Sequence, residues 1–356
     1  MDQNVTIITN EKCWMEQTAI DQLGGVARLP GVTHAVGLPD LHAGKSPIGI
    51  AVETRGVLYP HLVGSDIGCG MGLFATGIPL RKYKQERFVT RLEHIRALED
   101  LPTGDAYPEA SPIPDLGTIG GGNHFAEFQA LEEVFLPQET AALGLERDRL
   151  YLLIHSGSRG YGQRILNQFP GAAGLPAGSG PAAAYLSAHA DALLWARRNR
   201  ALVAEKLVDY LGFGHTVLPL LDCFHNYVEE RDGAFLHRKG AVSALDGLVV
   251  LPGSRGSLTY LLRPAADTAG SLHSLSHGAG RKWARSLCKS RIKDKYDRDS
   301  IRSTRLKSRV VCHDTELLFQ EAPEAYKNID QVVSALVEHG LAEVAATLRP
   351  LITYKG

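Results

Sequence analysis

Short apolar runs that each end in a polar loop recur along this chain, and they constrain its fold more than any other feature. The runs are THAVGLPDLH (33–42), LYLLIHSGSRG (150–160), VLPLLDCFHN (217–226) and GLVVLPGSRG (247–256). Apolar runs of this length that are bounded by glycine, serine or asparagine are typical of buried β-strands. Each run therefore predicts a strand followed by a turn.

Helical patterns lie between these runs. Residues 184–214 predict one or two helices that stop at Gly212 and Gly214. Strands and helices together predict an α+β fold in which mixed β-sheets are flanked by helices. GTIGGGNH (117–124) lacks the strand–GxGxxG–helix context of a dinucleotide site, so the fold is not predicted to be a Rossmann fold.

A late pair of helices is also predicted. NIDQVVSALVEHG (328–340) gives the first helix, with Asp330 as its cap and Gly340 as its end. LAEVAATL (341–348) gives the second helix.

Composition favours one large globular domain in a reducing compartment. The 356 residues are 44% hydrophobic and 22% charged, with a formal net charge of −1, which is enough apolar material for a large core. We expect a single domain over 1–356 with inserted loops near 100–115 and 170–184. No apolar run is long enough for a membrane span, and the start does not resemble a signal peptide. Five irregularly spaced cysteines argue against a disulfide framework, so we expect a cytoplasmic protein with no membrane contact.

Side chains that can bind a metal ion or act as nucleophiles lie at the ends of apolar runs or in glycine-rich loops. They are Asp66 and Cys69 in SDIGCGMG, Asn123 with His124, His155, His225 with Asn226, and His277. A single histidine at a strand end is usually structural, but recurrence in five loops favours a shared site. Thiolate, imidazole and carboxylate groups suit Mn, Fe, Co, Ni or Zn, and one thiolate can bridge two ions. Asp40 and His42 either orient such ligands or stabilise a turn.

A basic segment follows the last of these loops. Residues 281–309 hold twelve Lys or Arg and three Asp, so the segment carries +9 and the rest of the chain −10. A charge run is usually a solvated helix face. The excess here is one-sided, which favours contact with a nucleic acid.

Several longer motifs, in order, resemble one known family. They are LPDLHAGKSPIGIAV, SDIGCGMG, GTIGGGNHFAEF, LIHSGSRGYG, FHN, HRKGA, LPGSRGS, SLSHGAGRKWARS and YKG. Together they resemble the RtcB family of GTP- and manganese-dependent RNA ligases. The resemblance implies an RtcB-like fold with a central cleft for two metal ions and a nucleotide.

The resemblance also assigns roles by position. It implies that two Mn²⁺ ions are held by Asp66, Cys69, His124, His155 and His225, with Cys69 as the bridge. It implies that GTP guanylylates His277 and contacts Asn123, Glu127, Lys355 and, in the guanine pocket, Ser254 and Tyr326. Arg159 and Arg281 match arginines that hold phosphates.

The implied reaction joins RNA ends that bear a 2′,3′-cyclic phosphate or 3′-phosphate to 5′-hydroxyl ends. It passes through a guanylyl-histidine and an RNA-(3′)pp(5′)G intermediate. The compact length resembles a shorter subgroup linked to a release-factor-like protein, which suggests RNA repair. The alternatives are a dimetal phosphoesterase that opens cyclic phosphates without ligation, a non-catalytic RNA-binding protein and, with least support, a structural zinc protein.

Overall fold

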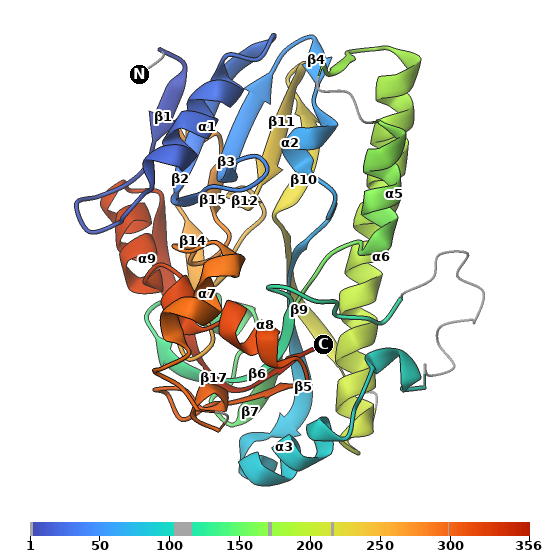
Figure 1. Cartoon of the computed structure of the whole chain (residues 1–356), viewed down its shortest axis with the longest axis vertical. Helices are drawn as coiled ribbons and strands as arrows, with labels where there is room; N and C mark the ends of the chain where they lie inside the picture. The colour runs from blue at the N-terminus through green and yellow to red at the C-terminus, as the bar shows by residue number, and fades with distance from the viewer. Residues whose placement is uncertain (1–2, 103–115, 170–172, 215–216, 298) are drawn as a thin grey trace.

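The computed structural model describes residues 3–102, 116–169, 173–214, 217–297 and 299–356. This described part contains two large β-sheets, two short strand pairs and nine α-helices (Figure 1). The predicted α+β fold is confirmed. Most of loop 100–115 lies outside the described residues. The loop expected at 170–184 is shorter than predicted, because its last five residues already belong to a helix.

The larger sheet has eight strands. Its order is β13-β14-β17-β6-β7-β5-β9, with β16 paired to β17. Its strands are β5 (Gly70–Pro79), β6 (Phe125–Val134), β7 (Arg149–Ser156), β9 (Leu218–Phe224), β13 (Val249–Pro252), β14 (Thr259–Pro264), β16 (Arg309–Cys312) and β17 (Ala342–Lys355). Three of the four apolar runs form strands of this sheet. Run 150–160 contains most of β7, run 217–226 contains β9, and run 247–256 contains β13.

The smaller sheet contains the fourth run. Its order is β1-β2-β3-β11-β10, with β1 (Val5–Ile7), β2 (Val32–His42), β3 (Ile48–Thr54), β10 (Asn226–Arg231) and β11 (Ala234–Lys239). Two short pairs complete the strands: β4 (Val57–Leu58) with β8 (Leu175–Pro176), and β12 (Ala241–Ser243) with β15 (Ser274–Ser276). The β9–β10 connection passes from one sheet to the other, so the residues at this crossing lie between both sheets.

Helices cover the outer faces of the sheets. They are α1 (Gln17–Ala27), α2 (Pro60–Val63), α3 (Gln85–Glu93), α4 (Pro137–Ala142), α5 (Gly160–Gln168), α6 (Gly180–Tyr210), α7 (Arg285–Ile292), α8 (Thr315–Gln320) and α9 (Ile329–Glu338). The long helix α6 runs beside β5 and β7, and α7 and α8 lie toward the viewer in Figure 1. Within the described ranges, no helix combines the length and apolar character that a membrane span needs.

The late helix pair was predicted wrongly in its second half. Residues 342–355 form strand β17, which pairs with β6, β14 and β16. Alanine and leucine favour a helix in isolation, but a position among three strands outweighs that preference. The expected cap is also wrong, because the side chain of Asn328 accepts from the backbone N–H of Asp330 and caps α9.

Candidate metal and nucleotide site

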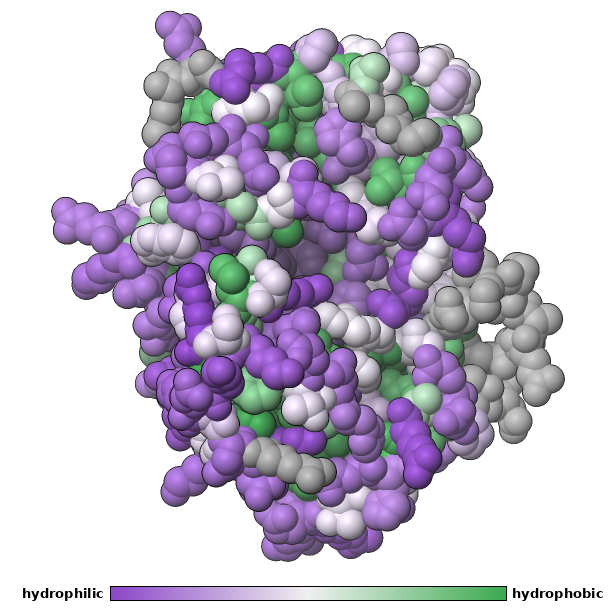
Figure 2. Space-filling model, in the orientation of Figure 1, coloured by the Kyte–Doolittle hydropathy of each residue, from purple (hydrophilic) through white to green (hydrophobic). Residues whose placement is uncertain are grey.

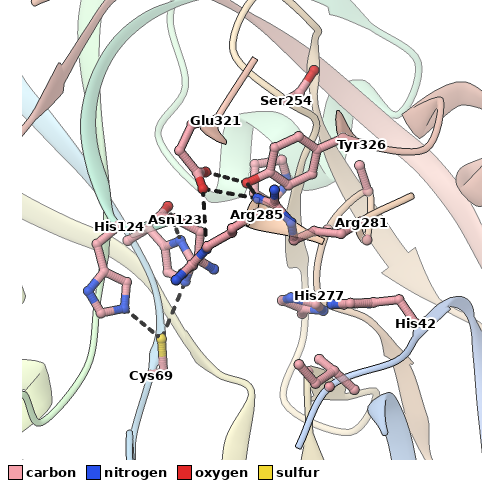
Figure 3. Close-up of a pocket in the computed structure, with 18 of the residues that line it drawn as sticks. His42, Cys69, Asn123, His124, Ser254, His277, Arg281, Arg285, Glu321 and Tyr326 are labelled. Atoms are coloured by element: carbon pink, nitrogen blue, oxygen red, sulfur yellow. Dashed lines mark hydrogen bonds and ion pairs between the residues drawn. The ribbon is translucent and has the colours of Figure 1, made fainter. Parts of the chain in front are cut away.

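A cavity of about 1000 Å³ gathers the loops that the sequence singled out. Figure 2 shows the corresponding hollow near the centre of this face, with mostly hydrophilic residues around it. Every predicted site residue except Arg159 lines this cavity, and Arg159 lies directly beside it, against His124. Side chains from β2, the β4–β5 loop, β6, β7 and the C-terminal half of the chain therefore meet in one place (Figure 3).

The predicted metal ligands form one cluster around Cys69. Its Sγ lies 3.3 Å from Nε2 of His124 and 3.3 Å from Nε2 of His155. Nε2 of His225 lies 3.4 Å from that of His155, and a carboxylate oxygen of Asp66 lies 3.0 Å from Nε2 of His124. Donor atoms of Cys69, His124 and His155 all lie within 4.8 Å of one another. The five predicted ligands are thus brought together.

His155 shows how this cluster is prepared for a cation. Its Nδ1 lies 3.1 Å from the carbonyl oxygen of Asn123, which can only accept a hydrogen bond. Nδ1 therefore carries the proton, and Nε2 presents a lone pair toward Cys69 and His225. Burial and the neighbouring histidines hold the pKa of His155 and of His225 well below the usual range. Neutral imidazoles with converging lone pairs are the form that binds metal ions.

The thiol and carboxylate complete a donor set that fits a transition metal. Burial and the adjacent Asp66 raise the pKa of Cys69 well above its usual value, so a metal ion must displace the thiol proton on binding. Oδ1 of Asp66 is buried without a hydrogen-bond partner among the described residues. An orphaned carboxylate oxygen beside a thiol and three imidazoles fits divalent ions of borderline softness.

Helix α6 and one glycine fix the loops of the cluster. Arg200 is fully buried and donates to the carbonyl oxygens of Gly68 (2.9 Å) and Ser156 (2.6 Å), next in sequence to Cys69 and His155. Gly157 lies against Asp66, because a Cβ there would be 2.2 Å from its carboxylate. The sequence thus brings the ligand loops close through one buried guanidinium and one residue without a side chain.

His277 is oriented by a buried carboxylate. Oδ2 of Asp40, at the end of β2, lies 2.6 Å from Nδ1 of His277 and accepts from its backbone N–H at 3.1 Å. Burial acts to raise the pKa of Asp40, but the His277 imidazole outweighs it and the pKa is lowered. The ring of His277 lies 4.7 Å from that of His225, centroid to centroid. Nδ1 is therefore occupied, and Nε2 is the nitrogen left for chemistry.

Glu321 organises the other end of the cavity. Its carboxylate accepts from Arg281 (3.0 Å) and Tyr326, and lies 3.7 Å from Nζ of Lys355 and 3.7 Å from Arg285. Burial acts to raise its pKa, but Lys355 and Arg281 lower it below the usual range. Figure 3 shows Ser254, Tyr326, Arg281 and Glu321 grouped away from Cys69 and His124. One carboxylate thus collects several of the predicted nucleotide-site residues.

Three predicted residues remain: Asn123, Glu127 and Arg159. Asn123 has its Oδ1 3.5 Å from Arg285, and Glu127 is buried on β6, where it accepts from Gln129 (2.7 Å) and Thr353. Burial raises the pKa of Glu127. Nη1 of Arg159 lies 3.2 Å from Nδ1 of His124, which places this guanidinium at the metal cluster.

Sequence reasoning missed two of these groups. Glu321 lies in LFQEAPEAY (318–326), which carries no motif or repeated pattern that would mark it. Arg285 was read only as part of the basic segment. Asp40 is predicted to orient metal ligands or to stabilise a turn, but it contacts His277, which is not one of the predicted metal ligands. His42, weighed with it, bonds through Nδ1 to the carbonyl of Asp40 at 2.8 Å.

Comparison with known proteins defines the family. The family model for tRNA-splicing ligase RtcB matches residues 22–107 and 97–356. The chain therefore belongs to the tRNA-splicing ligase RtcB family. RNA-splicing ligase RtcB2 of Escherichia coli is 44% identical over 367 residues, which cover 99% of this chain and 95% of that protein.

More distant relatives also match over nearly their whole length. RNA-splicing ligase RtcB of Escherichia coli K12 is 31% identical over 430 residues, covering 99% of this chain and all of that protein. tRNA-splicing ligase RtcB of Archaeoglobus fulgidus is 28% identical over 447 residues, covering 96% of this chain and 92% of that protein. The resemblance seen in the motifs is confirmed.

Proposed function

We propose that this protein is a GTP-dependent RNA ligase. It joins RNA ends bearing a 2′,3′-cyclic phosphate or 3′-phosphate to 5′-hydroxyl ends. The observation that carries the proposal is the contact between Asp40 and His277 in the same cavity as the Cys69 cluster. A buried carboxylate that fixes one imidazole nitrogen and leaves the other free is the arrangement of an activated nucleophile.

The first step is guanylylation of His277. Nε2 attacks the α-phosphorus of GTP, a P–N bond forms, and the bond to the β-phosphate oxygen breaks to release pyrophosphate. Asp40 holds the Nδ1 proton during the attack and balances the positive charge that develops on the ring. The product is a guanylyl-histidine.

The second and third steps move GMP to the RNA and then release it. An oxygen of the RNA 3′-phosphate attacks the guanylyl phosphorus and breaks the P–N bond, giving RNA-(3′)pp(5′)G and restoring His277. The 5′-hydroxyl of the second RNA end then attacks the 3′-phosphorus, and GMP leaves. A 2′,3′-cyclic phosphate is first opened by water to a 3′-phosphate.

Polar residues around the cavity bind the reacting groups. The nucleotide would be held by five residues that line the cavity: Lys355, Tyr326, Ser254, Asn123 and Glu127. Arg159 and Arg281 supply planar guanidinium donors for phosphate oxygens. Arg281 is held by Glu321 and Tyr326, so its position is fixed before a ligand arrives.

The metal cluster is assigned to two divalent ions, with Mn²⁺ as the proposed metal. Asp66, Cys69, His124, His155 and His225 would hold them, and Cys69 would be shared between the two. When bound, such ions supply Lewis acidity at phosphorus and lower the pKa of an attacking water or hydroxyl.

The alternative is a dimetal phosphoesterase that opens cyclic phosphates without ligation. It would use the Cys69 cluster but would need neither His277 nor its contact with Asp40. That contact therefore favours the ligase. We further propose that the ligase works in RNA repair in the cytoplasm, in functional connection with a release-factor-like protein.

Covalent labelling tests the proposal. Purified protein is incubated with α-labelled GTP and Mn²⁺, beside His277→Ala and the matched control His94→Ala, which changes the residue that follows α3. We expect an acid-labile adduct that survives denaturation on wild type and His94→Ala, and none on His277→Ala. Folded, metal-loaded wild type that opens cyclic phosphates but forms no adduct would favour the phosphoesterase.

A further inference from the structure

A second, smaller groove of about 570 Å³ opens beside the main cavity. It is lined by Trp14, Glu16, Lys282, Trp283, Ala284, Leu287 and Arg291, and we call it the tryptophan groove. The groove shares four lining residues with the main cavity, Glu16, Lys282, Trp283 and Ala284, so the two spaces are adjacent. The groove therefore lies next to the place where a reacting RNA end would be bound.

Two of the large exposed apolar side chains of the described chain meet here. Trp14 is 49% exposed and Leu287 is 45% exposed, and Trp283 is partly exposed beside them. Exposed tryptophan is uncommon in a folded chain, and a group of apolar side chains inside a polar rim marks an interaction site.

Hydrogen bonds fix the backbone at or next to both tryptophans. Cys13, next to Trp14, is buried. Its thiol donates a hydrogen bond to the carbonyl oxygen of Pro39 (3.1 Å), and its backbone N–H donates to Oδ1 of Asn10 (2.9 Å). The backbone N–H of Trp283 donates to Ala325 at 3.3 Å, and its carbonyl accepts from Arg281 at 3.1 Å. Both tryptophans therefore project from backbone that hydrogen bonds hold in place.

The charge of the groove favours an anionic occupant. The guanidinium of Arg291 lies 5.0 Å and Nζ of Lys282 lies 5.9 Å from the centre of the Trp283 ring. Both are exposed, and within the described part of the chain neither has a carboxylate at ion-pair distance. The one carboxylate of the groove, Glu16, already accepts from the backbone N–H of Ala43 at 2.8 Å.

We infer that the tryptophan groove binds single-stranded RNA next to the end that reacts in the cavity. This rests on the proposed function for its substrate. Unpaired bases stack on Trp14 and Trp283, and Lys282 and Arg291 contact the phosphates between them. Aromatic faces interleaved with cations are how proteins bind single strands without reading their sequence, whereas duplex bases are already stacked. The ligase therefore binds its substrate partly through base stacking outside the reaction centre.

Intrinsic fluorescence tests the inference without any chemistry. The chain has three tryptophans, and the buried Trp195 is removed by Trp195→Phe so that the signal comes from Trp14 and Trp283. This protein is titrated with a short oligouridylate bearing a 3′-phosphate, in the absence of GTP. We expect quenching on binding, with an affinity that falls as salt rises.

Substitutions assign the binding to the groove. Trp14→Ala and Trp283→Ala should each weaken binding about tenfold, and Trp283→Phe should lose less because it keeps a stacking ring. Arg291→Ala should weaken binding and reduce its salt dependence. The matched controls are Leu218→Ala, a 61% exposed leucine on β9, and Arg87→Ala on α3, and both should bind as wild type does.

Two results would overturn the inference: no quenching on titration, or unchanged affinity in the Trp14→Ala, Trp283→Ala double variant. Unchanged RNA affinity with lost binding of a protein partner would make the groove a protein interface instead. Labelling with GTP is measured in parallel and needs no RNA. Wild type that binds RNA through the groove but forms no adduct would contradict the proposed reaction and leave the groove standing.

Discussion

Asp40 and His277 are separated by 237 residues in sequence, yet one carboxylate oxygen of Asp40 contacts both Nδ1 and the backbone N–H of His277. The contact fixes the ring in rotation and in tautomer at once. It joins the end of β2 in the smaller sheet to the loop that follows β15. The proposed nucleophile is thus positioned by a residue from the other half of the chain.

Asp40→Asn tests this relationship. The amide keeps the shape but has no charge to hold the Nδ1 proton, so guanylylation should slow by about 10²- to 10⁴-fold. The measurement is the rate of acid-labile adduct formation, with bound metal and melting temperature recorded for the same sample. A rate within a few fold of wild type would show that the contact is structural.

Gly280→Ala tests the same contact from the side of the loop. Gly280 has a φ of +71°, and a Cβ there would lie 2.4 Å from the carbonyl oxygen of Asp40. We expect Asp40 to be displaced and guanylylation to fall, with a loss of about 1–3 kcal/mol in the free energy of unfolding. Gly340→Ala is the matched control, because its φ is +64° but open space surrounds it. Equal losses of guanylylation and stability in both variants would mean that backbone strain alone, and not displacement of Asp40, causes the effect.

Cys69→Ala tests the metal cluster. Without the thiolate, the histidines lose their shared neighbour, so the protein should lose bound metal and RNA joining while remaining folded. Metal content by mass spectrometry and joining of labelled RNA are the two readouts. Cys312→Ala, another buried cysteine in a separate apolar cluster, should keep both. Wild-type joining by Cys69→Ala would exclude a bridging role.

Glu321→Gln tests the charge balance around the nucleotide end. Glu321 is 4% exposed beside Arg281 and Lys355, and removing its charge leaves these two largely buried cations without their carboxylate. At pH 7 we expect a loss of about 3–5 kcal/mol in the free energy of unfolding by urea, together with weaker GTP labelling.

The same variant predicts a pH dependence. The pKa of Glu321 is lowered on folding, so its contribution to stability is complete above the unfolded value of about 4.3 and is lost as pH falls through the folded value. The stability gap between wild type and Glu321→Gln should therefore be constant from pH 7 to about pH 5 and shrink below that. A gap that stays constant into acid would mean that the lost contact is not electrostatic.

The structure brings the predicted ligands together partly because two of them lie at strand ends. His155 ends β7 and His225 follows β9, so strand pairing alone brings them near Cys69. Glu321 could not be found in this way, since it belongs to no motif and its role appears only when Arg281, Tyr326 and Lys355 surround it. β17 was mistaken for a helix because its alanines and leucines favour one locally, and only its three neighbouring strands decide otherwise.

The late position of strand β17 in the chain also determines when β6 can pair during translation. It pairs with β6, whose last residue is Val134, but β17 begins at Ala342, about 200 residues later. At ribosomal rates of about 5–20 residues per second, the edge of β6 waits roughly 10–40 seconds for its partner. Throughout that interval the nascent chain exposes an unpaired strand edge, which is a template for aggregation. Translation of this protein therefore includes a vulnerable period in which chaperones have a natural target.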